Sequence, residues 1–144
     1  MYLVTKEIRF CYGHRLLHYD GECRHLHGHN GLVEITFRSE TLDRRGMVID
    51  FSDIKGIVKG WIDEQMDHKM LLSHEDPLLP MIEEAGEPTY VFTDGNPTAE
   101  NISRKIYEFA KSEGLPVVKV RLWETDTSWA EYGEDVSPGT ASSG

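Results

Sequence analysis

Cysteine is scarce in this chain, which contains only Cys11 and Cys23. Two cysteines cannot build the disulfide framework of a small secreted domain, and no signal peptide is recognisable. We therefore expect a reduced, cytoplasmic setting. In that setting a thiol is free to serve as a metal ligand, a nucleophile or a base.

Basic residues are also few, and long apolar runs are absent. The formal net charge of −10 argues against non-specific binding to nucleic acid or to an anionic membrane. No stretch reaches the roughly 20 apolar residues that a membrane-spanning helix needs, and no internal repeat of fixed period is found. The composition, 39% hydrophobic in 144 residues, indicates one soluble domain. We expect this domain over residues 1–136 and a disordered tail over 137–144.

Histidine is concentrated near the N-terminus. His27 and His29 flank Gly28 in an alternating segment, so their side chains share one face about 7 Å apart at roughly 3.3 Å per residue. His14 ends a second alternating segment, on the side of its apolar residues. Alone, His14 fits a hydrogen-bonded core histidine. Because two more histidines lie in phase nearby, the pattern favours a zinc site made of all three.

Cys23 lies four residues before His27 in a polar loop. Its sulfur has three possible roles: a fourth zinc ligand, a nucleophile or base beside the metal, or inert packing. A closed site of one thiolate and three imidazoles would be structural, whereas three histidines with an open position and a free thiolate would be catalytic. The side chain of Cys11 points to the face opposite to that of Phe10 and Tyr12, and Cys11 is interpreted as an ordinary packing residue of the strand.

Periodicity predicts an alternation of strands and helices along the chain. Ser52 is the expected cap of the first helix, and Pro97 is expected in the first turn of the second, which ends at Gly114. The passage from Ser73 to Gly95 has no clear pattern beyond one short helix. The predicted elements are strands over about 2–14 and 29–40, helices over 52–66, about 78–84 and from 96 to 114, and strands over 117–124 and about 128–132.

Glu124 continues the apolar face of the strand predicted over 117–124 as a carboxylate. One interpretation is a strand end that frays into solvent. The other is a carboxylate held in a pocket, where it would accept paired N–H donors from a guanidine-like heterocycle edge.

Taken together, these residues resemble the 6-pyruvoyltetrahydropterin synthase and 6-carboxytetrahydropterin synthase superfamily over most of the chain. The short spacing from Cys23 to the His-Gly-His motif is similar to that of the bacterial queuosine-pathway branch. The motifs that carry the resemblance are Phe10-Cys11-Tyr12-Gly13-His14, Cys23 before His27-Gly28-His29, Gly46-Met47-Val48-Ile49-Asp50-Phe51, Asp67-His68-Lys69, Pro97-Thr98-Ala99-Glu100-Asn101 and Glu124-Thr125.

The resemblance implies an α+β tunnelling fold (T-fold): a four-stranded antiparallel sheet with two helices packed on one face, in the order ββααββ. It implies a homohexamer, a dimer of trimers, with active sites at subunit interfaces. The implied roles are Zn²⁺ binding by His14, His27 and His29, catalysis by Cys23, Asp67 and His68, and substrate binding by Glu124, Glu100 and Thr98.

The implied reaction converts 7,8-dihydroneopterin triphosphate to 6-carboxy-5,6,7,8-tetrahydropterin, with release of triphosphate and acetaldehyde, in queuosine and 7-deazapurine biosynthesis. Two alternatives stay open. The same site would stop at 6-pyruvoyltetrahydropterin if the carbon–carbon bond were not cleaved. A zinc-stabilised pterin-binding protein without turnover would result if Cys23 closed the metal shell.

Overall fold

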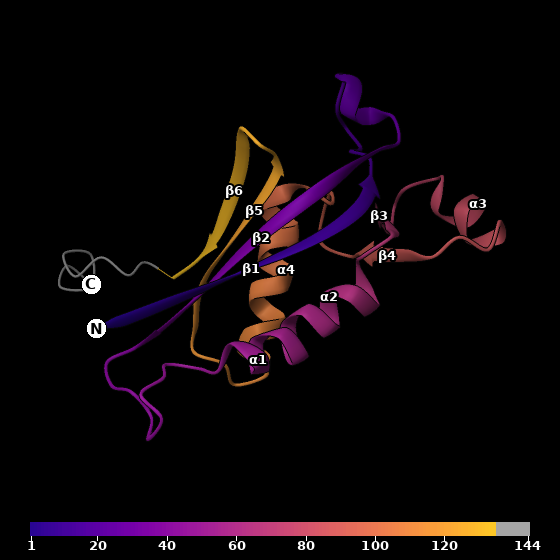
Figure 1. The fold of residues 1–144 in the computed structure, drawn as a ribbon. Coiled ribbons are helices and arrows are strands. Elements are labelled where there is room, and N and C mark those ends of the chain that lie inside the picture. The colour runs from indigo at the N-terminus through magenta and orange to yellow at the C-terminus, as the bar shows by residue number, and fades with distance from the viewer. Residues whose placement is uncertain (135–144) are drawn as a thin grey trace.

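The computed structural model describes residues 1–134, which form a mixed sheet with helices on one face (Figure 1). The strands lie in the order β4-β3-β1-β2-β5-β6. The elements are β1 (Tyr2–His14), the short 3-10 turn η1 (Glu22–Arg24), β2 (His27–Ser39), α1 (Phe51–Ile54), the π-helical turn η2 (Lys55–Lys59), α2 (Gly60–Gln65), β3 (Lys69–Ser73), α3 (Leu79–Glu84), β4 (Thr89–Phe92), α4 (Ala99–Ser112), β5 (Val117–Thr125) and β6 (Ser128–Gly133).

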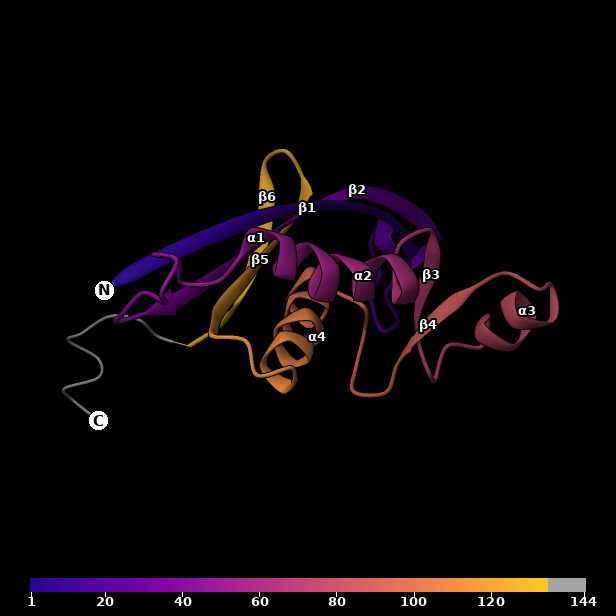
Figure 2. The ribbon, with the colours of Figure 1, turned by 60° about the horizontal axis from the view of Figure 1, so that its bottom comes forward.

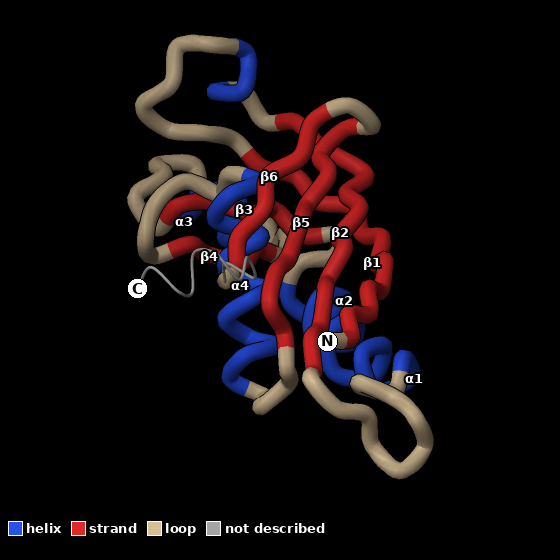
Figure 3. Tube along the Cα trace, turned by 90° about the vertical axis from the view of Figure 1, so that its left-hand side faces the viewer, coloured by secondary structure: helices blue, strands red, loops and turns tan. Residues whose placement is uncertain are grey.

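The long hairpin of β1 and β2 forms the centre of the sheet. The two strands pair antiparallel along their whole length, from Tyr2 opposite Ser39 to His14 opposite His27. Their alternating residues divide between a buried face and a more exposed face, as expected from the sequence. Figure 3 shows β1, β2, β5 and β6 side by side in one curved layer.

The prediction of a four-stranded antiparallel sheet is wrong, because the sheet has six strands. The two additional strands, β3 and β4, come from the poorly patterned region of the sequence and add parallel pairs beside β1. Leu71, Leu72 and Ser73 of β3 are all buried. Strands buried on both faces carry no polar–apolar alternation, so a period of two could not reveal them.

The helices cover the buried face of the sheet, as expected. Figure 2 shows α1, α2 and α4 on the same side of the strands, and their buried residues join those of β1, β2 and β5 in one core. The first helical segment runs without interruption from Phe51 to Gln65. Its cap is Asp50, whose carboxylate accepts from the backbone N–H of Ser52, so the prediction of Ser52 as the cap is wrong by two residues.

The start of α4 also differs from its prediction. Thr98 is the N-cap, with its hydroxyl accepting from the backbone N–H of Asn101. Pro97 therefore precedes the helix and is not in its first turn. Its carbonyl oxygen bonds the side chain of His14, the last residue of β1. The end of α4 is as expected, since Gly114 adopts a φ of 78° just beyond the last turn.

The segment that contains α3 projects from one end of the sheet in both ribbon views (Figures 1 and 2). The expected short helix is confirmed there as Leu79–Glu84. None of the helices within residues 1–134 is both long and apolar enough to cross a membrane. The tail expected over 137–144 lies outside the described residues.

Candidate metal centre and active site

The hairpin register brings the three predicted zinc ligands together. His14 lies directly opposite His27, and His29 lies opposite Tyr12 two residues further along β2. The ring centroids are 4.5 Å apart for His14 and His27, 5.0 Å for His14 and His29, and 5.1 Å for His27 and His29. One ligand nitrogen from each ring lies within 4.8 Å of the other two. We call these three residues the histidine trio.

Two rings of the trio are oriented by backbone carbonyl groups. Nδ1 of His14 lies 2.7 Å from the carbonyl oxygen of Pro97, and Nδ1 of His27 lies 2.7 Å from that of His25. Each Nδ1 therefore carries the hydrogen that it donates, which leaves Nε2 as a bare lone pair. Within the described chain, these two Nε2 atoms are the buried side-chain polar atoms without a hydrogen-bond partner.

This arrangement fits a metal ion. Neutral imidazoles with Nδ1 bonded to the backbone are the usual form of histidine zinc ligands. Burial lowers the pKa of His14, so its ring is held neutral and able to ligate. A buried nitrogen without a hydrogen-bond partner is costly unless a cation satisfies it. The trio can therefore hold Zn²⁺.

Glu124 faces the trio from the end of β5. Its Oε2 atom lies 3.6 Å from Nε2 of His14 and 3.8 Å from Nε2 of His29. The hydroxyl group of Tyr12 donates to the same oxygen at 3.1 Å. Of the two interpretations of Glu124, the structure supports the pocket, because only about a quarter of its side chain is exposed.

Cys23 lies in the η1 turn and is half-buried. Its carbonyl oxygen accepts from the backbone N–H of Leu16 at 2.9 Å, which closes the loop that follows His14. In the described chain, the group of ligand atoms that includes the trio contains no sulfur.

Asp67 and His68 form a hydrogen-bonded pair just before β3. Oδ2 of Asp67 lies 2.7 Å from Nδ1 of His68, and Oδ1 accepts from the backbone N–H of Cys11 at 3.0 Å. Burial raises the pKa of Asp67, but these two hydrogen bonds outweigh it and hold that pKa below its usual value. His68 has a φ of 58°, which is uncommon for a residue other than glycine and is typical of functional sites.

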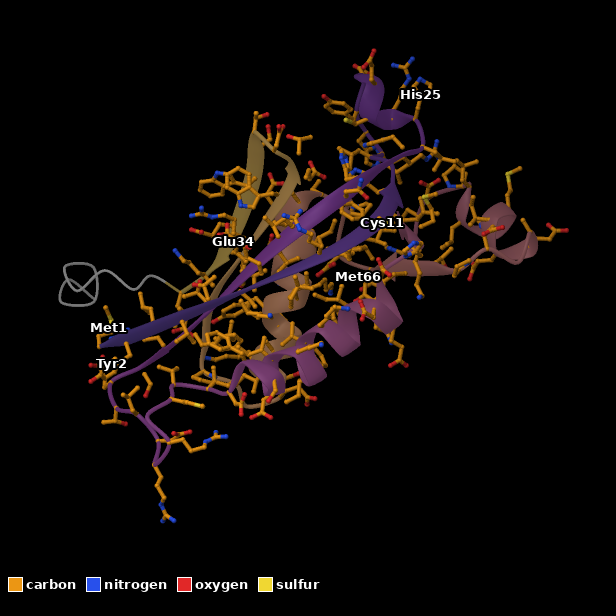
Figure 4. The ribbon with its side chains drawn as sticks, viewed as in Figure 1. Met1, Tyr2, Cys11, His25, Glu34 and Met66 are labelled. Carbon is orange, nitrogen blue, oxygen red and sulfur yellow. The ribbon has the colours of Figure 1, made fainter. Side chains whose placement is uncertain are left out.

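The pair and the trio lie on opposite faces of β1. The ligand atoms of Asp67 and His68 cluster with the sulfur of Cys11, whereas Tyr12 and His14 point to the buried face. Figure 4 labels Cys11 near the end of β1. The side chains of the trio and of the pair therefore point to different faces of β1.

A cavity of about 680 Å³ borders both groups. Gly13 and Gly28, which are cross-strand partners, lie at its wall. At Gly13 the Met70 side chain packs where a Cβ atom would lie, so glycine permits this close contact. The lining includes Cys11, His27, His29, His68, Met70 and Ile82.

The other two predicted substrate residues lie at the start of α4. The hydroxyl of Thr98 is committed to the helix cap. Glu100 is exposed in the first turn. Thr98 directly follows Pro97, whose carbonyl oxygen bonds the ring of His14.

Sequence reasoning missed three residues of this region. Alternation identifies Tyr12 only as an apolar strand residue, although an aromatic hydroxyl next to a predicted ligand is a signal for a polar contact. Cys11 is more than an ordinary packing residue, since its sulfur clusters with the ligand atoms of the Asp67 and His68 pair. Pro97 acts through its backbone, which leaves no signal in residue type.

Comparison with known proteins agrees with this geometry. Residues 3–135 match the family model described as 6-pyruvoyl tetrahydropterin synthase. A 6-carboxy-5,6,7,8-tetrahydropterin synthase from Rickettsia bellii is 36% identical over 138 residues, covering 91% of this chain and 99% of the relative. The enzyme of that name from Aquifex aeolicus is 36% identical over 159 residues, covering 92% and 98%.

Solved structures show the same fold. An uncharacterized protein from Wolinella succinogenes aligns with a TM-score of 0.78 at 28% identity, covering 93% of this chain and 98% of its own. The 6-pyruvoyl tetrahydropterin synthase of Caenorhabditis elegans aligns with a TM-score of 0.66 at 24% identity, covering 94% and 98%. The resemblance drawn from the sequence motifs is confirmed: the chain belongs to the 6-pyruvoyl tetrahydropterin synthase family.

Proposed function

We propose that this protein is a zinc-dependent 6-carboxy-5,6,7,8-tetrahydropterin synthase. It would convert 7,8-dihydroneopterin triphosphate to 6-carboxy-5,6,7,8-tetrahydropterin and release triphosphate and acetaldehyde. The observation that carries the proposal is the convergence of the histidine trio with Glu124 on its open side. The curated relatives from Rickettsia bellii and Aquifex aeolicus bear this name.

His14, His27 and His29 would hold the zinc ion. When bound, Zn²⁺ supplies a Lewis acid that acidifies the hydroxyl groups of the substrate side chain. Glu124, whose Oε2 lies 3.6 Å and 3.8 Å from Nε2 of His14 and His29, would accept hydrogen bonds from the substrate beside the metal, since an ionised carboxylate can accept two parallel hydrogen bonds. Thr98 and Glu100, at the start of α4, are proposed to border the bound substrate.

Proton transfer would be divided between a thiol and an imidazole. Cys23 would take a proton from the substrate side chain as a thiolate. His68 would donate or accept a proton, because an imidazole can act as general acid or general base. Asp67 orients the ring of His68 through their hydrogen bond.

The separation of the trio from the Asp67 and His68 pair supports an assembly in which a second copy completes each site. The sheet has edges where another chain can pair: β3 covers β1 only at Tyr12–His14, and β6 is the last strand on the other side. We propose the homohexamer, a dimer of trimers, with its active sites at subunit interfaces. A cytoplasmic role in queuosine or 7-deazapurine biosynthesis is part of this proposal.

The family model carries the name of the 6-pyruvoyl enzyme, so that reaction is the second candidate. Product analysis separates the two. Zinc-loaded protein is incubated with 7,8-dihydroneopterin triphosphate, and acetaldehyde and pterins are measured by chromatography. Acetaldehyde with 6-carboxytetrahydropterin supports the proposal, whereas 6-pyruvoyltetrahydropterin without acetaldehyde contradicts it.

The non-catalytic alternative is tested with Cys23→Ala. Loss of turnover with unchanged zinc content supports Cys23 as the base. Loss of zinc together with unfolding would assign Cys23 to a structural metal site.

A further inference from the structure

Tyr12 is a buried side chain in contact with the zinc site that the proposed chemistry does not use. The residue is 3% exposed, and its ring lies beside two rings of the trio, with centroid distances of 5.2 Å to His14 and 5.6 Å to His29. Its hydroxyl group donates to Oε2 of Glu124 at 3.1 Å. No other hydrogen bond to that carboxylate is present within residues 1–134.

The carboxylate of Glu124 is close to the position of a metal ligand. Zinc bonds of about 2.0–2.2 Å imply that ligand atoms of a tetrahedral site lie about 3.4 Å apart. Oε2 of Glu124 lies 3.6 Å and 3.8 Å from the Nε2 atoms of His14 and His29. These two distances exceed the ligand spacing of about 3.4 Å by only a few tenths of an ångström. A shift of that size would make Oε2 a metal ligand, and the coordination position that the substrate needs would then be occupied.

The Tyr12 hydroxyl restrains the oxygen that would make this shift. A hydrogen bond from a neutral phenol occupies one lone pair of Oε2 and fixes the carboxylate at the end of the Tyr12 ring. The ring itself cannot follow the carboxylate toward the metal, because it packs against Phe10 as well as the two histidines. Oε1 has no such restraint from the described residues and can face a ligand.

We propose that Tyr12 is a positioning residue that holds Glu124 off the metal, so that the fourth coordination position stays open and the carboxylate faces the substrate. The inference rests on the proposed function insofar as the trio must bind zinc. It assigns to Tyr12 a role that does not depend on which pterin product is formed.

The test is Tyr12→Phe, which removes the hydroxyl and keeps the ring. Zinc affinity is measured by competition with a chromophoric chelator, and the metal shell is followed in the visible spectrum of the Co²⁺-substituted protein. Because the released carboxylate would join the shell, we expect Tyr12→Phe to bind Zn²⁺ several-fold more tightly and to shift the Co²⁺ bands. KM for the substrate should rise, since Glu124 is then withdrawn from it.

A double variant identifies the carboxylate as the cause. In a Glu124→Gln background, Tyr12→Phe should change neither zinc affinity nor the Co²⁺ spectrum, because the anionic ligand is already gone. Tyr107→Phe is the matched control. Its hydroxyl also donates to a carboxylate, that of Glu134 at 2.7 Å, but belongs to α4 and lies away from the trio.

Unchanged or weaker zinc binding by Tyr12→Phe, with an unchanged Co²⁺ spectrum, overturns the inference and leaves the proposed function standing. An effect of Tyr12→Phe that persists in the Glu124→Gln background also overturns it. The effect would then come from the packing of Tyr12 against the histidine rings and not from the Glu124 carboxylate. Failure of the wild-type protein to bind Zn²⁺ or Co²⁺ overturns both this inference and the proposed zinc dependence. Circular dichroism confirms that each variant is folded.

Discussion

The Nδ1–H group of His14 donates a 2.7 Å hydrogen bond to the carbonyl oxygen of Pro97, which lies 83 residues later in the chain. This contact joins the end of β1 to the residue before the cap of α4. The position of α4 therefore controls the orientation of a proposed zinc ligand. A change in the helix cap should therefore alter the affinity for zinc.

Thr98→Ala tests this connection. Loss of an N-cap hydroxyl costs about 1 kcal/mol of stability, and a frayed first turn would release the Pro97 carbonyl. We expect a lower urea midpoint and zinc binding weakened several-fold, measured by chelator competition. Ser112→Ala is the control, because its hydroxyl bonds the helix backbone at the opposite end of α4. Equal zinc affinities for both variants would disprove the connection.

Metal removal should lower stability through the trio. A ligand that binds only the folded state stabilises it by about 2.7 kcal/mol at 100 times its Kd, so chelation should lower the melting temperature of the zinc-loaded protein. His27→Gln should contain no zinc and should melt at the same temperature with and without chelator. His25→Gln is the matched control, since its exposed side chain lies at the loop tip (Figure 4) while its backbone carbonyl still orients His27. A chelator effect in His27→Gln would show that zinc binds elsewhere.

Strand patterning explains how much of this site the sequence could predict. Alternation along residues 2–14, and along the second strand when its parity is extended back to His27, placed the trio on one face, because one side of this hairpin is buried and the other is not. The same logic failed for β3, which is buried on both faces. The parallel register of β1 and β3 puts Asp67 and His68 on the far side of β1. The residue types do not determine that register. The sequence therefore allowed Asp67 and His68 to be predicted as site residues, but not their position relative to the trio.

Arg15, which directly follows His14, forms an ion pair with Asp76 in the segment before α3. This pair connects that segment to the end of β1. Nε of Arg15 donates to Oδ2 of Asp76 at 2.7 Å, and the Asp76 side chain is fully buried. Asp76→Ala would leave the partly buried guanidinium uncompensated, which costs about 3 kcal/mol. Equilibrium urea unfolding at pH 7 measures this loss. A change below about 0.5 kcal/mol, the size expected at an ordinary surface position, would contradict this anchoring role.

The same pair predicts a pH dependence. Burial raises the pKa of Asp76, but the hydrogen bonds from Arg15 and Leu78 outweigh it and the net pKa is lowered. A carboxyl group with a lowered pKa in the folded state contributes stability above its unfolded pKa of about 3.9 and loses it as pH falls further. Wild-type stability should therefore decline below about pH 4, and Asp76→Asn should decline less over that interval. Parallel acid profiles for the two proteins would refute the assignment.

Two glycine positions should respond in opposite directions. Gly60 lies in a helix with φ −58° and ψ −43°, and the space that a Cβ atom would occupy is open. Gly60→Ala should therefore stabilise the protein by about 0.5–1 kcal/mol, because alanine restricts the unfolded chain. At Gly133 a Cβ atom would clash with the carbonyl oxygen of Val118, so Gly133→Ala must displace β6 or β5. Thermal unfolding of both variants checks the contrast, and a stable Gly133→Ala would count against the described β5–β6 pairing.

We propose that the trio with Glu124 of one copy and the Asp67 and His68 pair of another act together across a subunit interface. Mixed oligomers of two inactive variants test this claim. Glu124→Ala and His68→Ala are each prepared alone and then assembled together, and mixed oligomers are isolated with two affinity tags. Acetaldehyde formation from dihydroneopterin triphosphate should return in the mixed oligomers, because some interfaces combine two intact halves. Mixed oligomers that contain both chains and remain inactive would contradict the claim.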